Sequence, residues 1–215
     1  MILFDVINGT VNEEARTNRI SGVVIGVVTN NQDPDGMGRV KVKFPWLSAV
    51  DESYWARIAA PMAGKKRGIY FLPEVDDEVL VAFEHGDVRF PYVLGALWNG
   101  QDAPPVTNGG GKNNVRIIQS RSGHVVKLND EDGKETIEII DKSQKNSIVV
   151  DTAKNTITIS TDKDITLSAS NGTIKLDAQN VEIKSSSATK LEAGSTMDVK
   201  ASGTMTVKGS TVNIN

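Results

Sequence analysis

The sequence has 215 residues, enough for one or two modest domains, and 39% of them are hydrophobic while only 5% are aromatic. The formal net charge of −3 at pH 7 argues against a dedicated nucleic-acid-binding protein. The chain has no cysteine, which excludes a disulfide framework and a thiolate metal site.

The first 19 residues are predicted to form an N-terminal arm, because they are polar after the first few positions. Met1–Asp5 carries an early acid and no basic segment, so it does not resemble a signal peptide. No apolar run approaches the ~18–20 residues of a membrane span. We therefore expect assembly in the cytoplasm, with release by lysis or as part of a larger machine.

Residues 20–100 are predicted to form a small closed β-barrel of the OB type. This segment contains all three Trp, all three Tyr and four of the five Phe. It shows short strand patterns separated by turn signals, without a helical period. Such a series of short strands fits an OB-fold. The expected strands are Gly22–Thr29, Gly38–Phe44, Tyr54–Ala60, Glu78–Glu84 and Tyr92–Trp98.

Residues 101–114 are predicted to be a flexible linker, since they contain Pro104-Pro105 and the run Gly109–Lys112. That glycine run ends in Asn113 and follows no predicted strand, which excludes a phosphate-binding loop. Residues 115–215, which follow, contain no aromatic side chain. A compact core without aromatics is unusual, because these side chains supply much of the burial.

The aromatic-free segment is periodic instead. Its repeat is an apolar-x-apolar triplet followed by about five polar or small residues, which is the alternation of a strand that then turns a corner. Looser alternation precedes it at Val125–Leu128, Ile137/Ile139 and Ile148/Val150. The apolar positions expected to point inward are Ile157, Ile159, Ile165, Leu167, Ile174, Leu176, Val181, Ile183, Leu191, Met197, Val199, Met205 and Val207.

Two apolar side chains per repeat cannot bury themselves, so each repeat needs neighbours. Three chains wound around one axis satisfy this need, because inward residues fill a narrow prism and strands pair between subunits. We therefore predict an all-β protein whose residues 115–215 form a triple-stranded, intertwined β-helix in a homotrimer. A single-chain β-solenoid or a sandwich with regular turns is the alternative.

The candidate chemical groups favour structural roles. His85 and His124 are the only histidines, and neither forms a pair with metal-ligand spacing. The acids Glu74, Asp76, Asp77 and Glu78 could pair for glycoside hydrolysis, but a turn between strands explains them better. Asp33–Gly36 and Asn129–Gly133 are predicted turns, with calcium a minor option for the second. We expect no enzyme activity, cofactor or metal.

The basic run Lys65–Arg67 supports a less favoured interpretation. OB-folds bind single-stranded nucleic acid through basic grooves and aromatic platforms, and Trp46, Tyr54 and Trp55 lie nearby in the sequence. That function leaves the repeats of residues 115–215 unexplained. We therefore expect no nucleic-acid partner.

Several motifs resemble the OB domain of phage baseplate spike proteins (baseplate assembly protein V) and of the VgrG proteins of type VI secretion. The segments that carry this resemblance are Gly38–Trp46, Trp55–Pro61, Leu72–Phe83 and Gly86–Gly95. Arg121–His124 with Leu128–Asp130 resembles the start of the spike in that family. The resemblance covers roughly residues 20–215, without the long N-terminal hub domain of VgrG and without a lysozyme domain.

The resemblance implies a non-enzymatic central spike of a contractile tail or injection system, driven through a target membrane when the sheath contracts. Its expected place is the tail baseplate of a virion or of an extracellular particle. The expected partners are two further copies, a baseplate hub protein and a small PAAR-like tip protein. The tip is predicted to dock on Val212, Asn213, Ile214 and Asn215. A trimeric adhesin or tail fibre that binds a surface glycan is the alternative.

Overall fold

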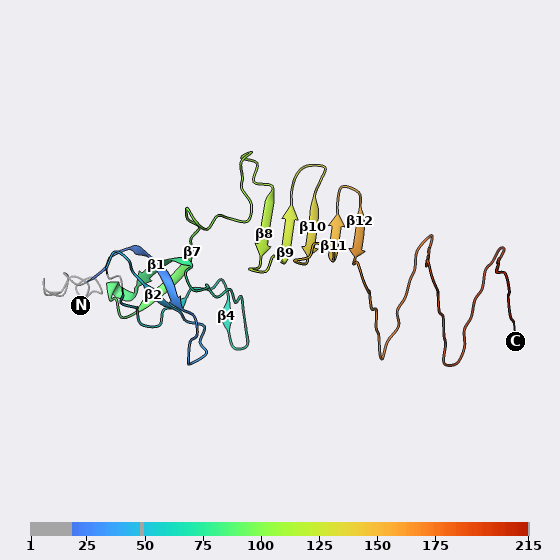
Figure 1. Ribbon diagram of the computed structural model, residues 1–215, viewed down its shortest axis with the longest axis horizontal. Helices are drawn as coiled ribbons and strands as arrows, with labels where there is room; N and C mark the ends of the chain where they lie inside the picture. The colour runs from blue at the N-terminus through green and yellow to red at the C-terminus, as the bar shows by residue number, and fades with distance from the viewer. Residues whose placement is uncertain (1–18, 48–49, 215) are drawn as a thin grey trace, which may run out of the picture. The chain divides into compact units, whose positions relative to one another are not determined.

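The computed structural model describes residues 19–47 and 50–214, and it divides into two compact units with the boundary between Asp162 and Lys163. The first unit contains two five-stranded sheets and a two-stranded hairpin (Figure 1). The second unit, residues 163–214, contains no assigned strand.

The first sheet closes into a barrel. Its strands lie in the order β2-β1-β6-β7-β3, antiparallel except for the parallel pair β3 and β7. Val40 and Ala56 exchange backbone hydrogen bonds of 3.1 and 2.7 Å, which join the chain before β2 to the chain before β3 and so connect the two ends of the sheet. The strands are β1 (Val23–Asn30), β2 (Lys41–Lys43), β3 (Arg57–Ile58), β6 (Glu78–Phe83) and β7 (Pro91–Ala96).

The barrel core consists mainly of β-branched side chains that alternate with more exposed ones along the strands. In β6, for example, Val79, Val81 and Phe83 are buried while the residues between them are not. This alternation is what period-two strands with one inner face require. The buried hydrophobic residues are Val28, Val40, Val42, Phe44, Ala56, Val79, Val81, Phe83 and Val93.

The five predicted barrel strands are all present, although the second and third are much shorter than expected. The hairpin of β4 (Ala63–Gly64) and β5 (Arg67–Gly68) was not predicted from the sequence. Its residues are glycine-rich and basic, and nothing in their pattern alternates. The predicted turn at residues 84–87 contains a short 3₁₀ segment, η1 (Glu84–Gly86), where His85 has a positive φ of 51°.

The predicted turn at Asp33–Gly36 is confirmed, and Asp33 organises it. Its carboxylate accepts hydrogen bonds from the backbone N–H groups of Asp35, Met37 and Arg39 and forms a 2.6 Å ion pair with the Arg39 guanidinium. The Arg39 hydrogen bond is the main reason that the pKa of Asp33 lies well below its usual value. Gly36 has a φ of 65°, which a side chain would disfavour.

The second sheet is a meander in which each strand pairs with the next, antiparallel, in the order β12-β11-β10-β9-β8. The predicted alternations at 125–128, 137–139 and 148–150 lie in its strands. Asn129–Gly133 is confirmed as part of a hairpin turn, with Gly133 at a φ of 74°. The strands are β8 (Val115–Gln119), β9 (Val125–Asn129), β10 (Thr136–Ile140), β11 (Ser147–Asp151) and β12 (Thr156–Ser160).

This pairing differs from the prediction that the chains are intertwined from residue 115 onward. Between residues 115 and 160 each strand finds its partner in the same chain, and this includes Ile157 and Ile159 of β12. The physical reason is the spacing: these strands are separated by tight turns that reverse the chain. Gln144 and Asn155 take positive φ values of 60° and 54° in two of them. The strict eight-residue repeat begins only after β12.

We expect Gly26→Ala to destabilise the barrel. A Cβ at Gly26 would lie 2.3 Å from Val42 Cγ1 and 3.1 Å from the Lys43 carbonyl oxygen, and Val42 is fully buried. Overpacking of this kind costs about 1–3 kcal/mol. Thermal melting measures the loss, and Gly100→Ala, whose Cβ meets nothing within 4 Å, is the control. Equal melting temperatures for the two variants would contradict this packing.

We expect the β10–β11 turn to weaken in acid. The Ser143 hydroxyl, together with the Asn146 backbone and side-chain N–H groups, lowers the pKa of Asp141 from its usual 3.8 to about 2. A depressed pKa stabilises the fold above the unfolded value and loses that contribution as pH falls through the folded value. Denaturation from pH 5 to pH 2 should therefore show a smaller acid-induced loss in Asp141→Asn than in the unchanged chain. An identical pH dependence would contradict this.

Candidate assembly interface

The two faces of the β8–β12 sheet differ in character. Because the register places Ile118 opposite Val126, Val126 opposite Ile139 and Ile139 opposite Ile148, these side chains share one face. A second row of paired residues crosses the same face, from Leu128 through Ile137 and Val150 to Ile157. Apart from Arg116, the face is apolar across all five strands. Its members are Ile118, Val126, Leu128, Ile137, Ile139, Ile148, Val150, Ile157 and Ile159.

The opposite face is largely polar. Lys127 and Glu138 form a cross-strand ion pair of 3.1 Å on it, and the Thr136 hydroxyl donates to the same carboxylate at 2.6 Å. Burial raises the pKa of Glu138, but the Thr136 hydrogen bond and the Lys127 partner outweigh it, so that the net pKa is lowered. This face therefore satisfies its own polar groups.

The apolar face is uncovered within one chain. Its exposed large side chains range from 41% at Val126 to 72% at Ile157. Contiguous apolar surface of this kind is rare on soluble monomers and marks an interaction site. Each buried apolar Å² contributes about 25 cal/mol, so covering this face supplies a strong driving force for association. We define these nine residues as the apolar sheet face.

The outer edge of β12 offers a second kind of attachment. Within residues 19–47 and 50–214, no strand pairs with that edge. An unpaired strand edge presents free N–H and C=O groups and is a template for another chain. The apolar sheet face and this edge meet in the same strand.

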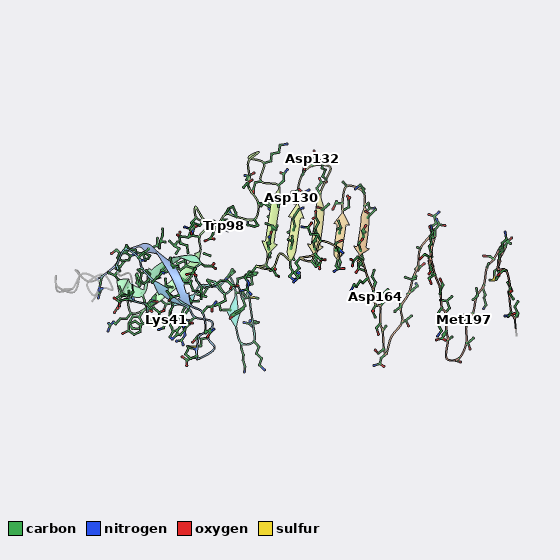
Figure 2. All side chains as sticks on the ribbon, in the orientation of Figure 1. Lys41, Trp98, Asp130, Asp132, Asp164 and Met197 are labelled. Atoms are coloured by element: carbon green, nitrogen blue, oxygen red, sulfur yellow. The ribbon has the colours of Figure 1, made fainter. Side chains whose placement is uncertain are left out.

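The structure does not bring the predicted inward residues of the second unit together. Side chains from Ile165 to Val207 are 49% to 71% exposed. Figure 2 shows labelled side chains such as Asp164 and Met197 projecting from an extended trace. The alternation is nevertheless visible in the ion pairs: Lys190 bonds Glu192 at 2.7 Å while Leu191 lies between them. Lys175 and Asp177 flank Leu176 in the same way.

The structure bears differently on two alternatives from the sequence. A single-chain solenoid needs strands paired within the chain, and residues 163–214 contain none. A nucleic-acid platform needs free aromatic rings: the Trp55 ring is covered by Arg39 and Lys41 at 5.8 and 5.6 Å from its centroid, whereas Trp46 and Tyr54 are 53% and 65% exposed. The basic residues Lys65–Arg67 lie apart from these rings in sequence, on the β4–β5 hairpin.

The candidate chemical groups occupy structural positions. In the acidic cluster, the Glu74 backbone N–H donates to the Asp77 carboxylate, and Asp76 takes a positive φ of 76°, which describes a turn. His124 Nδ1 accepts a hydrogen bond from the Lys142 backbone N–H at 3.3 Å. Across the described residues, no group of three or more His, Cys, Asp or Glu residues is arranged to hold a metal ion.

Two predicted contact regions are only partly described. Val212 and Ile214 are 48% and 91% exposed, while Asn215 lies outside the described residues. The N-terminal arm lies outside them as well, except for Arg19. Tip docking and hub contact therefore stay predictions.

The barrel is the part of the chain that is similar to known proteins. Residues 24–98 match the type VI secretion system/phage-baseplate injector OB domain. These residues form such a domain, and the predicted resemblance to VgrG-like baseplate spike proteins is confirmed over this part of the chain. No helix among the described residues has the length and apolar character to cross a membrane.

Several curated proteins are similar to this region. VgrG3, a type VI secretion system spike protein of Vibrio cholerae, is 35% identical over 95 residues, which is 40% of this chain and 9% of the relative. VgrG5, a spike protein of Pseudomonas aeruginosa, is 38% identical over 89 residues, 40% of this chain and 11% of the relative. An actin cross-linking toxin, VgrG1 of Vibrio cholerae, is 36% identical over 77 residues, 34% of this chain and 7% of the relative. The chain thus matches about a tenth of each relative's length.

We expect Ile139→Asp to destabilise the protein far more than Thr158→Asp. Ile139 lies on the apolar sheet face between Val126 and Ile148, whereas Thr158 lies on the opposite face of β12. Burying an unpaired carboxylate under a partner costs several kcal/mol. Melting temperatures measured at one fixed protein concentration test this, because the stability of an assembly depends on concentration. Equal effects of the two substitutions would show that the apolar face stays in water.

Proposed function

We propose that this protein is the trimeric central spike of a phage tail baseplate or related contractile injection system. The observation that carries the proposal is the apolar sheet face, which is uncovered in one chain and lies directly before 52 residues without in-chain strand pairing. The injector OB domain of residues 24–98 supports this class of machine. The function is structural.

Three copies can both cover the apolar sheet face and pair the free edge of β12. Three apolar sheet faces turned toward a common axis cover one another and make a dry, three-sided core. The free edge of β12 then pairs with the following segment of a neighbouring copy, so that the repeats of residues 163–214 form an intertwined β-helix. In this arrangement Ile165, Leu176 and Leu191 point inward and the lysines and acids between them point out.

The mechanism of such a spike is mechanical. Sheath contraction drives the prism through a target membrane, and the prism must resist unfolding under axial load. Inward burial along the whole shaft supplies that resistance, because every strand is held by two neighbours and by the core. Exposed charges such as Lys190 and Glu192 keep the shaft soluble and prevent lateral association. In this role the chain needs no catalytic group, and a baseplate hub and a PAAR-like tip are its partners.

The proposal predicts a homotrimer that depends on Leu191. Light scattering of the full chain at micromolar concentration should give three times the 23.1 kDa chain mass. Leu191→Asp should disrupt the trimer, since threefold symmetry places three carboxylates around one axis. Glu192→Ala should leave the trimer intact, because Glu192 lies on the other side of the extended chain.

A monomer at micromolar concentration would overturn the proposal. A trimer that tolerates both substitutions would instead show that the inward and outward assignment is wrong. If the chain is a trimer but a contractile particle assembled with Leu191→Asp still penetrates its target membrane, the shaft is not the penetrating element.

A further inference from the structure

The β4–β5 hairpin of the OB domain is exposed in a way that the barrel does not explain. Every residue from Ala59 to Phe71 is exposed, although this run contains Met62, Ile69, Tyr70 and Phe71. The hairpin is held by a two-residue ladder and by a 3.0 Å hydrogen bond from the Ile69 N–H to the Met62 carbonyl. A two-stranded hairpin of this size is marginal in water unless it packs against something.

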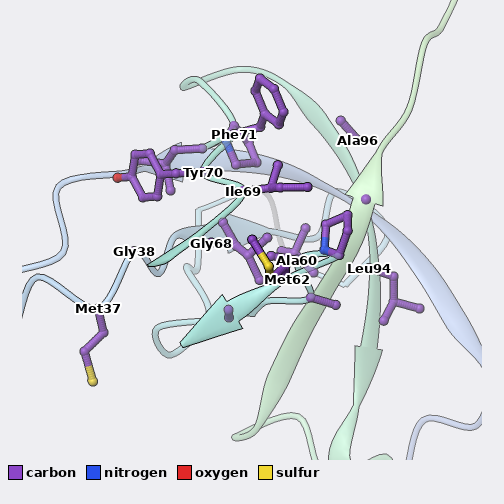
Figure 3. Close-up of a pocket in the computed structure, with 18 of the residues that line it drawn as sticks. Met37, Gly38, Ala60, Met62, Gly68, Ile69, Tyr70, Phe71, Leu94 and Ala96 are labelled. Carbon is purple, nitrogen blue, oxygen red and sulfur yellow. The ribbon is translucent and has the colours of Figure 1, made fainter. Parts of the chain in front are cut away.

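An apolar groove lies between this hairpin and the barrel. Its volume is about 910 Å³, and β7 lines it through Leu94 and Ala96. Figure 3 shows Met62 and Ile69 near the middle of the groove, with Tyr70 and Phe71 farther out. The groove therefore has apolar side chains on both walls, and it has room for a loop of another chain.

The tip of the hairpin carries three adjacent positive charges. Lys65, Lys66 and Arg67 are consecutive and exposed, and none of them forms an ion pair within the described part of the chain. Three like charges on a short hairpin repel one another, so an acidic partner would relieve the repulsion and attract the tip.

The β5–β6 loop supplies the complementary chemistry. It has the sequence Glu74-Val75-Asp76-Asp77, in which Val75 is 47% exposed between two acids. Glu74 has an ion pair with Arg121, whereas Asp76 is exposed and has no cation beside it in the residues described. An apolar side chain flanked by carboxylates matches an apolar groove beneath a basic tip.

We propose that the β4–β5 hairpin of one copy clasps the β5–β6 loop of the next copy in the assembled protein. Val75 enters the groove, and Asp76 meets the Lys65–Arg67 tip. The contact joins two different segments, hairpin to loop, so it is head-to-tail, and three such contacts close a ring. Within one chain, Pro73 and Asp77 of this loop border the groove, so the two segments are neighbours on the OB domain. This inference rests on the proposed trimer and adds to it a second interface, in the OB domains, separate from the shaft.

Cysteine cross-linking tests the contact directly, because the chain has no cysteine of its own. Two differently tagged full-length chains are co-expressed, one carrying Lys66→Cys and the other Asp76→Cys. A disulfide needs Cα atoms about 4.4–6.8 Å apart, so oxidation should produce a mixed-tag covalent dimer only if the two loops meet between copies. The matched control pairs Lys66→Cys with Asp132→Cys, an acid in the β9–β10 turn (Figure 2).

The expected result is a mixed-tag dimer, twice the chain mass, from the Lys66/Asp76 pair and little from the control pair. A trimer without the Lys66/Asp76 cross-link, or with the control cross-link in its place, overturns this contact and leaves the proposed spike standing. A monomeric chain overturns both.

Charge exchange gives a second readout. Lys66→Glu should lower the melting temperature of the trimer, and adding Asp76→Lys should restore it, because the exchanged charges attract again. Lys142→Glu, an exposed charge reversal in the β10–β11 turn, is the control, and Asp76→Lys should not restore it. Failure of Asp76→Lys to restore the Lys66→Glu variant would contradict the clasp.

Discussion

The constraint on which the rest of the structure depends is that a sheet with one apolar face must cover that face. The barrel meets this need alone, since closing the sheet through Val40 and Ala56 encloses Val28, Val42 and Val81. The β8–β12 meander does not, because it is a single layer whose apolar sheet face stays open. The same chain therefore contains a domain that encloses its own core and a sheet whose apolar face is uncovered within one chain.

The change from strands that pair within the chain to a segment without such pairing follows from the spacing of the turns. Up to β12 the chain has tight turns, with Gly133, Gln144 and Asn155 at positive φ, and consecutive strands pair with one another. After Ser160 the repeat shortens to eight residues, and no strand in residues 163–214 pairs within the chain. In the proposed trimer the free edge of β12 is the point at which pairing passes from one chain to its neighbours.

Much of this could be predicted from the sequence. Strand alternation and turn residues located the barrel strands, and the missing aromatics separated residues 115–215 from the barrel. The pairing of residues 115–160 could not be predicted, because alternation in Ile137–Ile139 specifies a face and not a partner. The β4–β5 hairpin was missed because Ala63–Gly68 has no periodicity, and the apolar groove beside it depends on tertiary structure. The alternation at Val126, Ile137 and Ile148 is the sequence signal for the apolar sheet face. The residues predicted to point inward, however, began only at Ile157.

In the proposed trimer, residues 163–214 are ordered by other copies of the chain. Amide hydrogen exchange of the full-length protein measures this most directly, because it reports backbone pairing residue by residue. We expect amides near Ile165, Leu191 and Val207 to exchange slowly, as slowly as those of β8–β12. Exchange of residues 163–214 at the rate of an unfolded peptide, while Val42 and Val81 in the barrel stay protected, would contradict it.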